Sequence, residues 1–326
     1  MLVLSLTDVE DLLDLDQLVE AVAAAMADLS AGRASMPPRG AATVAERHAM
    51  LAAMPAFLPS VGALTTKLVS LFPENRDRPT HQAIICCFDP ATGTPVAVMD
   101  GTYITATRTA AGSALASRYL AREGATVVAV IGSGVQARAH ARALARLPSV
   151  ESVRVAARDR AKAESLVGDL RVLGIPAGVA SSVEDAVASA DIVCATTHAD
   201  RPVIRREWLR PGSHVNSVGY NPSGEGEVDS ATIADAVVVV ESREAALAAP
   251  PAGAIELRRA IERGLIGPDH VHAELGELVT GVLKGRVDET AITLYKSVGV
   301  AVQDAAAASL VLDKALSKGA GFNVEI

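Results

Sequence analysis

The segment around Gly132 combines residue types and a spacing that suit a phosphate-bearing cofactor. Gly132, Gly134 and Ala137 form a Gly-x-Gly-x-x-Ala pattern between an apolar run at 127–131 and an alanine-rich, helical segment that begins at Val135. A strand that turns sharply into a helix exposes the amides of the first helical turn and the positive end of the helix dipole. Glycines let a pyrophosphate approach the backbone, and a third small residue lets the helix pack closely on its strand. The pattern therefore predicts that these residues bind a dinucleotide.

The elements around this turn alternate between strands and helices. Strands are predicted at 127–131, 152–156, 177–180, 191–195, 214–218 and 236–240, with helical stretches between them. This alternation is typical of a parallel, doubly wound sheet, the Rossmann-type α/β architecture. The glycine pattern also occurs in ordinary tight βα turns, but a preceding strand, a following helix and a second strand about twenty residues later favour the cofactor site.

Two arginines after the second of these strands indicate which cofactor is preferred. NAD-binding folds place an acidic residue at the end of this strand, where it binds the ribose hydroxyls. Here the strand ends Val-Ala-Ala, followed by Arg158, Asp159 and Arg160. Guanidinium groups suit a 2′-phosphate, so the sequence predicts NADP(H) rather than NAD(H). The alternative is a pair of solvated arginines at a helix start, and Asp159 keeps NAD possible.

Three cations near the N-terminus stand where the apolar pattern does not predict them. Arg39 follows Met-Pro-Pro, Lys67 lies inside a predicted strand, and Arg108 lies in a predicted helix. A buried charge is costly unless it is paired. Three separate structural ion pairs would explain these residues. A single site that clamps an anionic substrate explains them equally well.

The remaining elements predict a second, discontinuous α+β domain. A first strand is expected at 2–4, and the spacing of Thr7 and Glu10 predicts a capping box for a short helix. Further elements are a helix at 17–29 capped by Asp14, strands at 64–70, 83–88 and 96–99, helices at 105–120, 255–263, 273–280 and 301–317, and a turn-rich segment at 36–59. Because the last helix is apolar along one face, we expect it to pack on the first domain. The predicted domains are 1–121 with 303–326 for substrate binding and dimerisation, and 122–302 for the nucleotide.

Composition and charge exclude several classes of protein. The net charge of −8, without a Lys/Arg run, argues against a nucleic-acid partner. The N-terminus does not read as a signal peptide, and no 18 apolar residues follow one another, so we expect a cytoplasmic protein without a membrane partner. The three cysteines lack metal-site spacing and are expected to be buried free thiols. His270-x-His272 points to opposite sides of any regular element, so no metal site is expected. The acidic run Glu225, Glu227 and Asp229 is expected to cap a helix near residue 230.

Together these stretches resemble the ornithine cyclodeaminase and mu-crystallin family along almost the whole chain. The resemblance is carried by MPPRG at 36–40, TTKLVSLFPEN at 65–75, THQAIICCFDPATGTPVAVMDGTYIT at 80–105, ATRTAAG at 106–112, VAVIGSGVQARAH at 128–140 and LYKSVGVAVQDAAAA at 294–308. It implies a homodimer in which the first domain forms the subunit interface and the substrate site. It also implies NAD(P)-linked hydride transfer at a carbon that carries both a nitrogen and a carboxylate.

The resemblance also assigns roles to single residues. Arg39, Lys67 and Arg108 match the cations that bind the substrate carboxylate and act in catalysis, and Arg108 is expected to contact the cofactor as well. Gln136 and Ala137 match the amides under the pyrophosphate. The other matching positions are Thr196 (or Thr197), Val218 and Ser297 for cofactor contacts, and Val298 for a substrate contact. Lys67 is the best candidate for handling a proton, because burial beside two arginines lowers the pKa of a lysine.

One departure from the family pattern bears on the reaction. The cyclodeaminases use an aspartate in a Gly-Gly-Asp-x-Pro-Gly motif, and Tyr220 takes its place in the stretch Ser217-Val-Gly-Tyr-Asn-Pro-Ser-Gly224. We therefore predict reduction of an imine of a 2-oxo acid, such as Δ1-pyrroline-2-carboxylate, to the amino acid, because this reaction mainly needs orientation and a carboxylate clamp. The alternatives are an ornithine or lysine cyclodeaminase or alanine dehydrogenase using NAD, and a non-catalytic protein that binds a small ligand together with NADPH.

Overall fold

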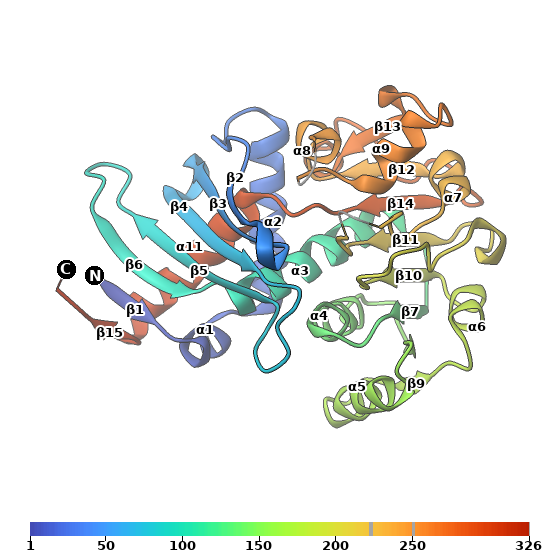
Figure 1. Ribbon diagram of the computed structural model, residues 1–326, viewed down its shortest axis with the longest axis horizontal. Coiled ribbons are helices and arrows are strands. Elements are labelled where there is room, and N and C mark those ends of the chain that lie inside the picture. The colour runs from blue at the N-terminus through green and yellow to red at the C-terminus, as the bar shows by residue number, and fades with distance from the viewer. Residues whose placement is uncertain (222–223, 250–251, 326) are drawn as a thin grey trace. The chain divides into compact units, whose positions relative to one another are not determined.

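The chain divides into two compact units, shown in a computed structural model (Figure 1). The structure describes residues 1–221, 224–249 and 252–325. Unit 1 comprises Met1–Arg108 and Gly299–Ile326, and unit 2 comprises Thr109–Val298. Helix α3 (Thr102–Leu120) runs without a break across the boundary between Arg108 and Thr109.

Unit 1 is built on a mixed sheet, called sheet A here. Its strands, in spatial order, are β15 (Phe322–Asn323), β1 (Leu2–Leu4), β6 (Pro95–Asp100), β5 (His81–Phe88), β4 (Ala63–Leu71), β3 (Ala49–Leu58) and β2 (Gly40–Val44). Strands β1 and β6 pair in parallel, and the other neighbours are antiparallel. The strands predicted at 64–70, 83–88 and 96–99 are thus confirmed.

One face of sheet A is covered by helices. Along β4 the side chains alternate, so that Thr65, Lys67 and Val69 face inward and are buried. Helix α11 (Ala301–Lys318) packs on β3, β4 and helix α2 (Leu15–Ser30), as Figure 1 shows. The expected return of the last helix onto the first domain is therefore confirmed. This packing brings α11 over the face that carries Lys67.

The N-terminal helices start at the caps that local chemistry selects. Asp14 accepts a hydrogen bond from the Gln17 amide and caps α2, as predicted. The predicted capping box of Thr7 and Glu10 is wrong, because helix α1 (Leu6–Leu12) begins two residues earlier. There Ser5 and Asp8 exchange the reciprocal capping bonds.

The segment predicted to be turn-rich instead forms strands β2 and β3. Alanine and proline disfavour strands, and β3 contains four alanines and Pro55. It becomes a strand because it pairs with β4 over its whole length and with β2 on the other side. Pairing with neighbours has outweighed local propensity here.

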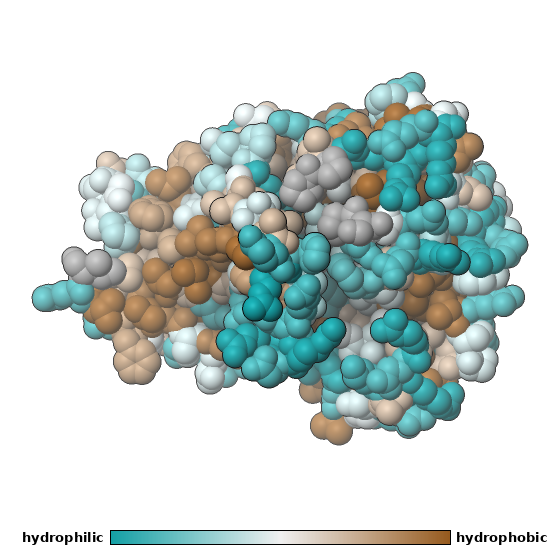
Figure 2. Space-filling view, in the orientation of Figure 1, coloured by the Kyte–Doolittle hydropathy of each residue, from teal (hydrophilic) through white to brown (hydrophobic). Residues whose placement is uncertain are grey.

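The second face of sheet A exposes apolar side chains. Leu51 on β3 is 49% exposed, and Ile84 on the central strand β5 is 45% exposed. Figure 2 shows apolar side chains gathered over these strands. Cys86, on the same face, is half-buried rather than buried as expected, whereas Cys87 and Cys194 are buried; all three thiols are free.

Unit 2 is built on a parallel sheet, called sheet B here. Its strands, in spatial order, are β13 (Val271–Glu274), β12 (Val237–Val240), β14 (Thr293–Lys296), β11 (His214–Ser217), β10 (Ile192–Ala195), β7 (Val127–Ile131), β8 (Ser152–Ala156) and β9 (Ala177–Val179). Its further helices are α4 (Val135–Leu144), α5 (Arg160–Val172), α6 (Val183–Ala188), α7 (Ser230–Asp235), α8 (Arg243–Leu247), α9 (Ile255–Glu262) and α10 (Leu275–Val279). The chain winds from β7 outward through β8 and β9, then crosses to β10 on the other side of β7. This confirms the Rossmann-type fold, with its switch point between β7 and β10.

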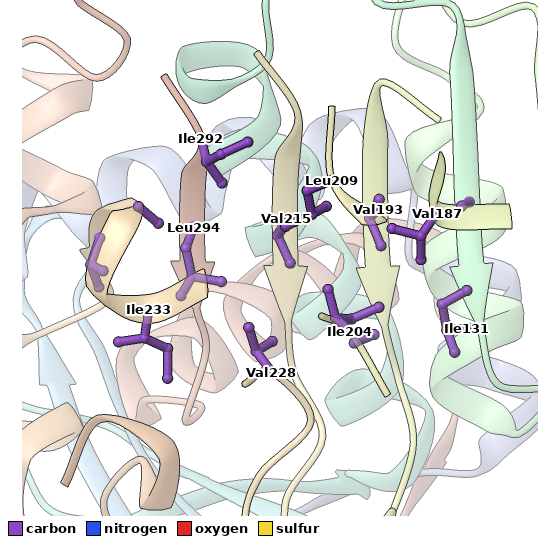
Figure 3. Close-up of a cluster of buried hydrophobic side chains, with 14 of the residues drawn as sticks. Ile131, Val187, Val193, Ile204, Leu209, Val215, Val228, Ile233, Ile292 and Leu294 are labelled. Atoms are coloured by element: carbon purple, nitrogen blue, oxygen red, sulfur yellow. The ribbon is translucent and has the colours of Figure 1, made fainter. Parts of the chain in front are cut away.

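The core of unit 2 explains why strands β7, β10 and β12 read as uninterrupted apolar runs. Val193, Val215 and Leu294 point from neighbouring strands into one buried cluster, which Ile233 of α7 covers (Figure 3). Strands buried on both faces have no solvent side on which to alternate. The helix predicted at 273–280 is present as α10, but it begins two residues later, because Ala273 and Glu274 belong to the edge strand β13, which pairs with β12.

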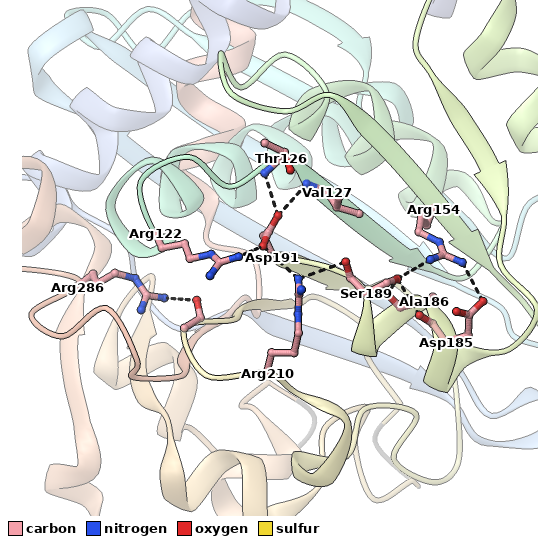
Figure 4. A network of polar contacts seen from close by, with 11 residues as sticks. Arg122, Thr126, Val127, Arg154, Asp185, Ala186, Ser189, Asp191, Arg210 and Arg286 are labelled. Carbon is pink, nitrogen blue, oxygen red and sulfur yellow. Dashed lines mark hydrogen bonds and ion pairs between the residues drawn. The ribbon is translucent and has the colours of Figure 1, made fainter.

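A single carboxylate organises the amino-terminal edge of sheet B. Asp191 accepts hydrogen bonds from the amides of Thr126 (2.9 Å) and Val127 (3.0 Å) and pairs with Arg122 and Arg210 (Figure 4). Burial alone would raise the pKa of Asp191, but these donors outweigh it and hold the pKa below its ordinary value. The amino-terminal edge is thus fixed structurally, which leaves the carboxyl edge for ligands.

No helix within the described part of the chain is long and apolar enough to cross a membrane.

Candidate functional site

The three cations predicted from sequence lie close together in unit 1, and two of them share one carboxylate. Lys67 Nζ lies 2.7 Å from Asp304 Oδ2, and Arg108 Nε lies 2.9 Å from Asp304 Oδ1. Arg39 donates from Nη2 to the carbonyl of Gly299 at 2.7 Å. The prediction of three separate ion pairs is therefore wrong: Lys67 and Arg108 share one partner. We call Arg39, Lys67, Arg108 and Asp304 the cation cluster.

Different elements carry these side chains to one place. Lys67 comes from the helix-covered face of β4, Arg108 from α3, and Asp304 from the first turn of α11. Arg108 is further fixed by Gln303, which accepts from Nη1 at 2.9 Å. Lys67, Arg108 and Asp304 are each at most 4% exposed, so their geometry is set by packing.

The turn at Gly299 holds Arg108 from another side. Gly299 has a φ of +72°, and a Cβ there would lie 2.9 Å from Arg108 Nη2. A side chain at this position would strain the backbone and displace the guanidinium. The Val-Gly-Val sequence before α11 thus has a steric reason.

The electrostatics of the cluster favour an added anion. Burial would raise the pKa of Asp304, but the charges of Arg108 and Lys67 outweigh it and keep the pKa below its ordinary value. Burial lowers the pKa of Lys67 to about 7, with Arg108 and Arg39 adding to the shift and Asp304 opposing it. Three cations therefore face one carboxylate, and the lysine can exchange its proton near neutral pH.

His81 belongs to the same face of sheet A. It is half-buried at the start of β5, paired in register with Leu71 of β4. Burial and the charges of Lys67 and Arg108 lower its pKa to about 4, so the imidazole is neutral at physiological pH. It is neither a simple surface histidine nor a cation of the cluster.

In unit 2 the glycine-rich turn is built as a phosphate cradle requires. Gly132 has a φ of +124°, and a Cβ there would lie 2.7 Å from Thr196 Oγ1. Gly134 is the N-cap of α4, no side chain caps this helix, and a Cβ at Gly134 would meet nothing within 4 Å. The first turn of α4 thus begins beside an open position at Gly134, and Val135 is exposed there. Uncapped amides beside an open glycine fit a pyrophosphate.

The other predicted cofactor residues lie on neighbouring strand ends at the carboxyl edge of sheet B. Thr196 follows β10 and donates to the Ile131 carbonyl at 2.8 Å, and Val218 follows β11. Ser297 and Val298 follow β14. The Ser297 hydroxyl and the Val298 amide donate to the two oxygens of Glu241 at 2.6 and 2.9 Å.

The residues after β8 bear on cofactor choice. Asp159 is the N-cap of α5 and accepts from the Lys162 amide, so its carboxylate is committed to the helix start. Arg158 is exposed, and Arg160 is exposed beside Glu164 at 3.0 Å. The two guanidinium groups border the end of β8, next to β7 in the sheet.

The structure also shows where the other residues singled out in the sequence lie. His270 and His272 each contact a backbone carbonyl, and no cluster of metal-binding side chains occurs in the ranges that the structure describes. Asp229 caps α7, as predicted, but Glu227 is buried and does not cap it. Tyr220 is half-buried after β11, and Pro222 and Ser223 of the same stretch lie outside the described residues.

Sequence reasoning missed Asp304 and Gln303. Their only signal is a pair of polar residues inside an otherwise apolar, alanine-rich helix start, Gly-Val-Ala-Val-Gln-Asp-Ala-Ala-Ala-Ala. The same rule that singled out the three cations applies to a buried carboxylate, because each needs a partner.

Comparisons with known proteins agree with this geometry. The sequence model of the ornithine cyclodeaminase/mu-crystallin family matches residues 1–319. The ketimine reductase mu-crystallin of Rattus norvegicus is 39% identical over 305 residues, which cover 91% of each chain. The structure of Thermococcus litoralis Δ(1)-pyrroline-2-carboxylate reductase in complex with NADH and L-proline has a TM-score of 0.95 and 38% identity, covering 99% of this chain and 100% of that one. An archaeal alanine dehydrogenase dimer with bound NAD has a TM-score of 0.92 and 35% identity, covering 100% and 99%. The chain therefore belongs to the ornithine cyclodeaminase/mu-crystallin family.

Proposed function

We propose that this protein is an NAD(P)H-dependent reductase that converts an imine of a 2-oxo acid, such as Δ1-pyrroline-2-carboxylate, to the amino acid. The cation cluster carries the proposal, since three buried or half-buried cations around one carboxylate leave positive charge for the carboxylate of a substrate. The uncapped turn at α4 and the reductases among the relatives support it.

The residues of the cluster have separate roles in this reaction. Arg39 and Arg108 hold the substrate carboxylate, as guanidinium groups do through paired hydrogen bonds. Lys67 contacts the same carboxylate and gives a proton to the imine nitrogen, for which a pKa of about 7 suits it. Val298 borders the substrate. The bound nicotinamide supplies the hydride to the imine carbon, and Lys67 regains its proton from water.

Unit 1 is assigned to substrate binding and dimerisation, and unit 2 to the nucleotide. The first turn of α4, including Gln136, holds the pyrophosphate. The residues after β10, β11 and β14, namely Thr196, Val218 and Ser297, border the nicotinamide end, and Arg108 contacts it too. A cytoplasmic setting, where NAD(P)H is available, belongs to the same proposal.

Three measurements test the proposed reductase function. With NADPH and Δ1-pyrroline-2-carboxylate, the protein should consume the absorbance of the reduced nicotinamide and form proline. Release of ammonia from ornithine without net cofactor use would instead identify a cyclodeaminase. NADPH binding without turnover of any imine in a panel would identify a non-catalytic binder.

NADP(H) is the proposed cofactor, bound through its 2′-phosphate by Arg158 and Arg160. Replacing both arginines by alanine removes one or two charge-assisted hydrogen bonds, so the KM for NADPH should rise roughly 10- to 100-fold while that for NADH changes little. Initial rates with each cofactor measure this. The control is Arg142→Ala, which removes an exposed arginine of α4. Equal losses for NADPH and NADH, or none, would reject the phosphate pocket.

We also propose that the apolar face of sheet A is the interface of a homodimer. Exposed Leu51 and Ile84 on this face would be buried by a second copy, and the alanine dehydrogenase relative is described as a dimer. Ile84→Glu should convert the protein to a monomer in light-scattering measurements. Val172→Glu is the matched control, because Val172 is 88% exposed on α5. A wild-type monomer, or a dimer that survives Ile84→Glu, would contradict this assignment.

A further inference from the structure

A buried glutamate links two strand ends at the carboxyl edge of sheet B. Glu227 is 2% exposed, and its Oε1 accepts from both the amide and the hydroxyl of Thr197, the latter at 2.6 Å. Its Oε2 accepts from the amide of Gly219 at 2.6 Å. Thr197 follows β10 and Gly219 follows β11, so one carboxylate joins the loops that leave two adjacent parallel strands.

A second buried pair holds the same loop from the other side. Lys296 Nζ lies 2.9 Å from Glu256 Oε1 and donates to the carbonyl of Gly219 at 3.0 Å. Glu256 in turn accepts from the Glu227 amide at 3.4 Å. The peptide groups on both sides of Gly219 are thus bonded to buried ionisable side chains.

Side chains and backbone pack tightly around Gly219 and Gly226. A Cβ at Gly219 would lie 2.2 Å from Glu227 Cδ and 2.3 Å from the Thr197 carbonyl oxygen. A Cβ at Gly226, whose φ is +90°, would lie 2.0 Å from Glu256 Cγ. Both glycines therefore let backbone and carboxylates approach more closely than any side chain would allow.

A carboxylate in this position is costly for stability. Burial raises the pKa of Glu227, while the charge of Lys296 and the hydrogen bonds from Thr197 oppose that shift. An apolar residue of similar volume would avoid the desolvation penalty. What the carboxylate adds is a defined geometry for the residues after β10 and β11, beside the switch point where such folds bind their ligands.

We propose that Glu227 is a positioning residue that fixes Thr197 and Gly219 so that the loops after β10 and β11 form the nicotinamide end of the cofactor site. This inference rests on the proposed function, since it presupposes a nicotinamide cofactor. Among the described contacts, neither the glycine-rich turn before α4 nor the arginines after β8 donate a hydrogen bond to Glu227. Removing the carboxylate should therefore affect one end of the cofactor and spare the other.

The test compares two ligands that differ only in the nicotinamide. In the full-length protein, Glu227→Gln puts an amide group against donors that need an acceptor. NADPH binding should weaken about tenfold, because the loops that meet the nicotinamide are no longer held in position before the cofactor binds. Binding of 2′-phospho-ADP-ribose, which lacks nicotinamide, should stay within about twofold of wild type. Calorimetry measures both, and NADH with ADP-ribose is used in the same way if the wild type prefers NAD.

Controls separate positioning from general damage. Glu225→Gln changes the same loop, but Glu225 is 47% exposed and faces Arg259 and Arg263 at 3.9 and 3.7 Å, so both ligands should bind as in wild type. If Glu227→Gln does not fold, Thr197→Val is used instead, because it removes the hydroxyl donor to Glu227. It should also weaken the binding of NADPH selectively, but by a smaller factor.

The outcomes distinguish the two proposals. A wild-type protein that binds neither cofactor overturns the proposed function. A wild-type protein that binds a cofactor, combined with variants that weaken both ligands equally or neither, overturns the positioning role alone.

Discussion

Replacing Lys67 by methionine should lower kcat/KM for imine reduction by roughly 100- to 10,000-fold, the range expected when a general acid is lost. The side chain is 2% exposed and packed between β4 and α11, and methionine preserves most of its volume. NADPH binding should be unchanged, because Lys67 is not part of the glycine-rich turn at 132–137 that we propose to bind the cofactor. Steady-state rates and calorimetry measure the two effects, and Lys162→Met, an exposed lysine of α5, is the control.

The pH dependence of kcat/KM tests the role of Lys67 in a second way. Lys67 is protonated below its pKa of about 7, so kcat/KM for reduction should fall as the pH rises above that value. Oxidation of the amino acid needs the neutral amine and should increase over the same range. In Lys67→Arg the charge stays at every accessible pH, so the falling limb should disappear together with most of the activity. A profile that is unchanged in either variant would remove Lys67 from the proton transfer.

Replacing Asp304 by asparagine should destabilise the protein by about 3–5 kcal/mol, because it leaves buried cations without their shared counter-ion. The carboxylate faces Lys67 at 2.7 Å and Arg108 at 2.9 Å, and its side chain is 1% exposed. Urea unfolding at neutral pH gives the free energy of unfolding. Asp313→Asn, on the exposed side of the same helix, should change it little.

The loss of stability caused by Asp304→Asn should depend on pH in a defined direction. The pKa of Lys67 is about 7 in the folded protein, below its ordinary value of 10.5. Between these two pH values the unfolded chain keeps a proton on Lys67 that the folded protein has lost. The contribution of this group to the free energy of unfolding therefore rises with pH. Without Asp304 the pKa of Lys67 should fall further, and the variant should recover stability as the pH rises from acid toward neutral. Asp304 itself has a lowered pKa, so its contribution in the wild type is present above pH 3.8 and lost as the pH falls through the folded-state pKa. A loss that is small at every pH would show that the cations do not depend on this carboxylate.

Local patterns in the chain were sufficient for most of unit 2. The β-branched runs at 127–131 and 237–240 are strands because they are buried in the sheet, and burial of this kind is visible in the composition of the run itself. The glycine turn was equally readable, since its constraint acts within six residues. Local chemistry was less reliable at helix starts: Asp14 was identified correctly, whereas Ser5 was missed in favour of Thr7.

The roles of residues whose partners are distant in sequence could not be read in the same way. The sequence marked Arg39, Lys67 and Arg108 as unusual but left open whether they share a partner. It gave no weight to Asp304 and interpreted Glu227 as a helix cap.

The sequence by itself determined the fold class, the glycine-rich turn and the presence of charges that need partners, because each depends on neighbours along the chain. The tertiary structure alone decided that β3 is a strand, that Asp304 joins Lys67 to Arg108, and that Glu227 binds two loops. The Asp304 contact with Arg108 joins residues 196 positions apart, and the Glu227 contact with Thr197 joins residues 30 apart, while β3 is fixed by strands on both sides. Such contacts form only once the sheets and helices have packed, so no local pattern in the sequence contains them.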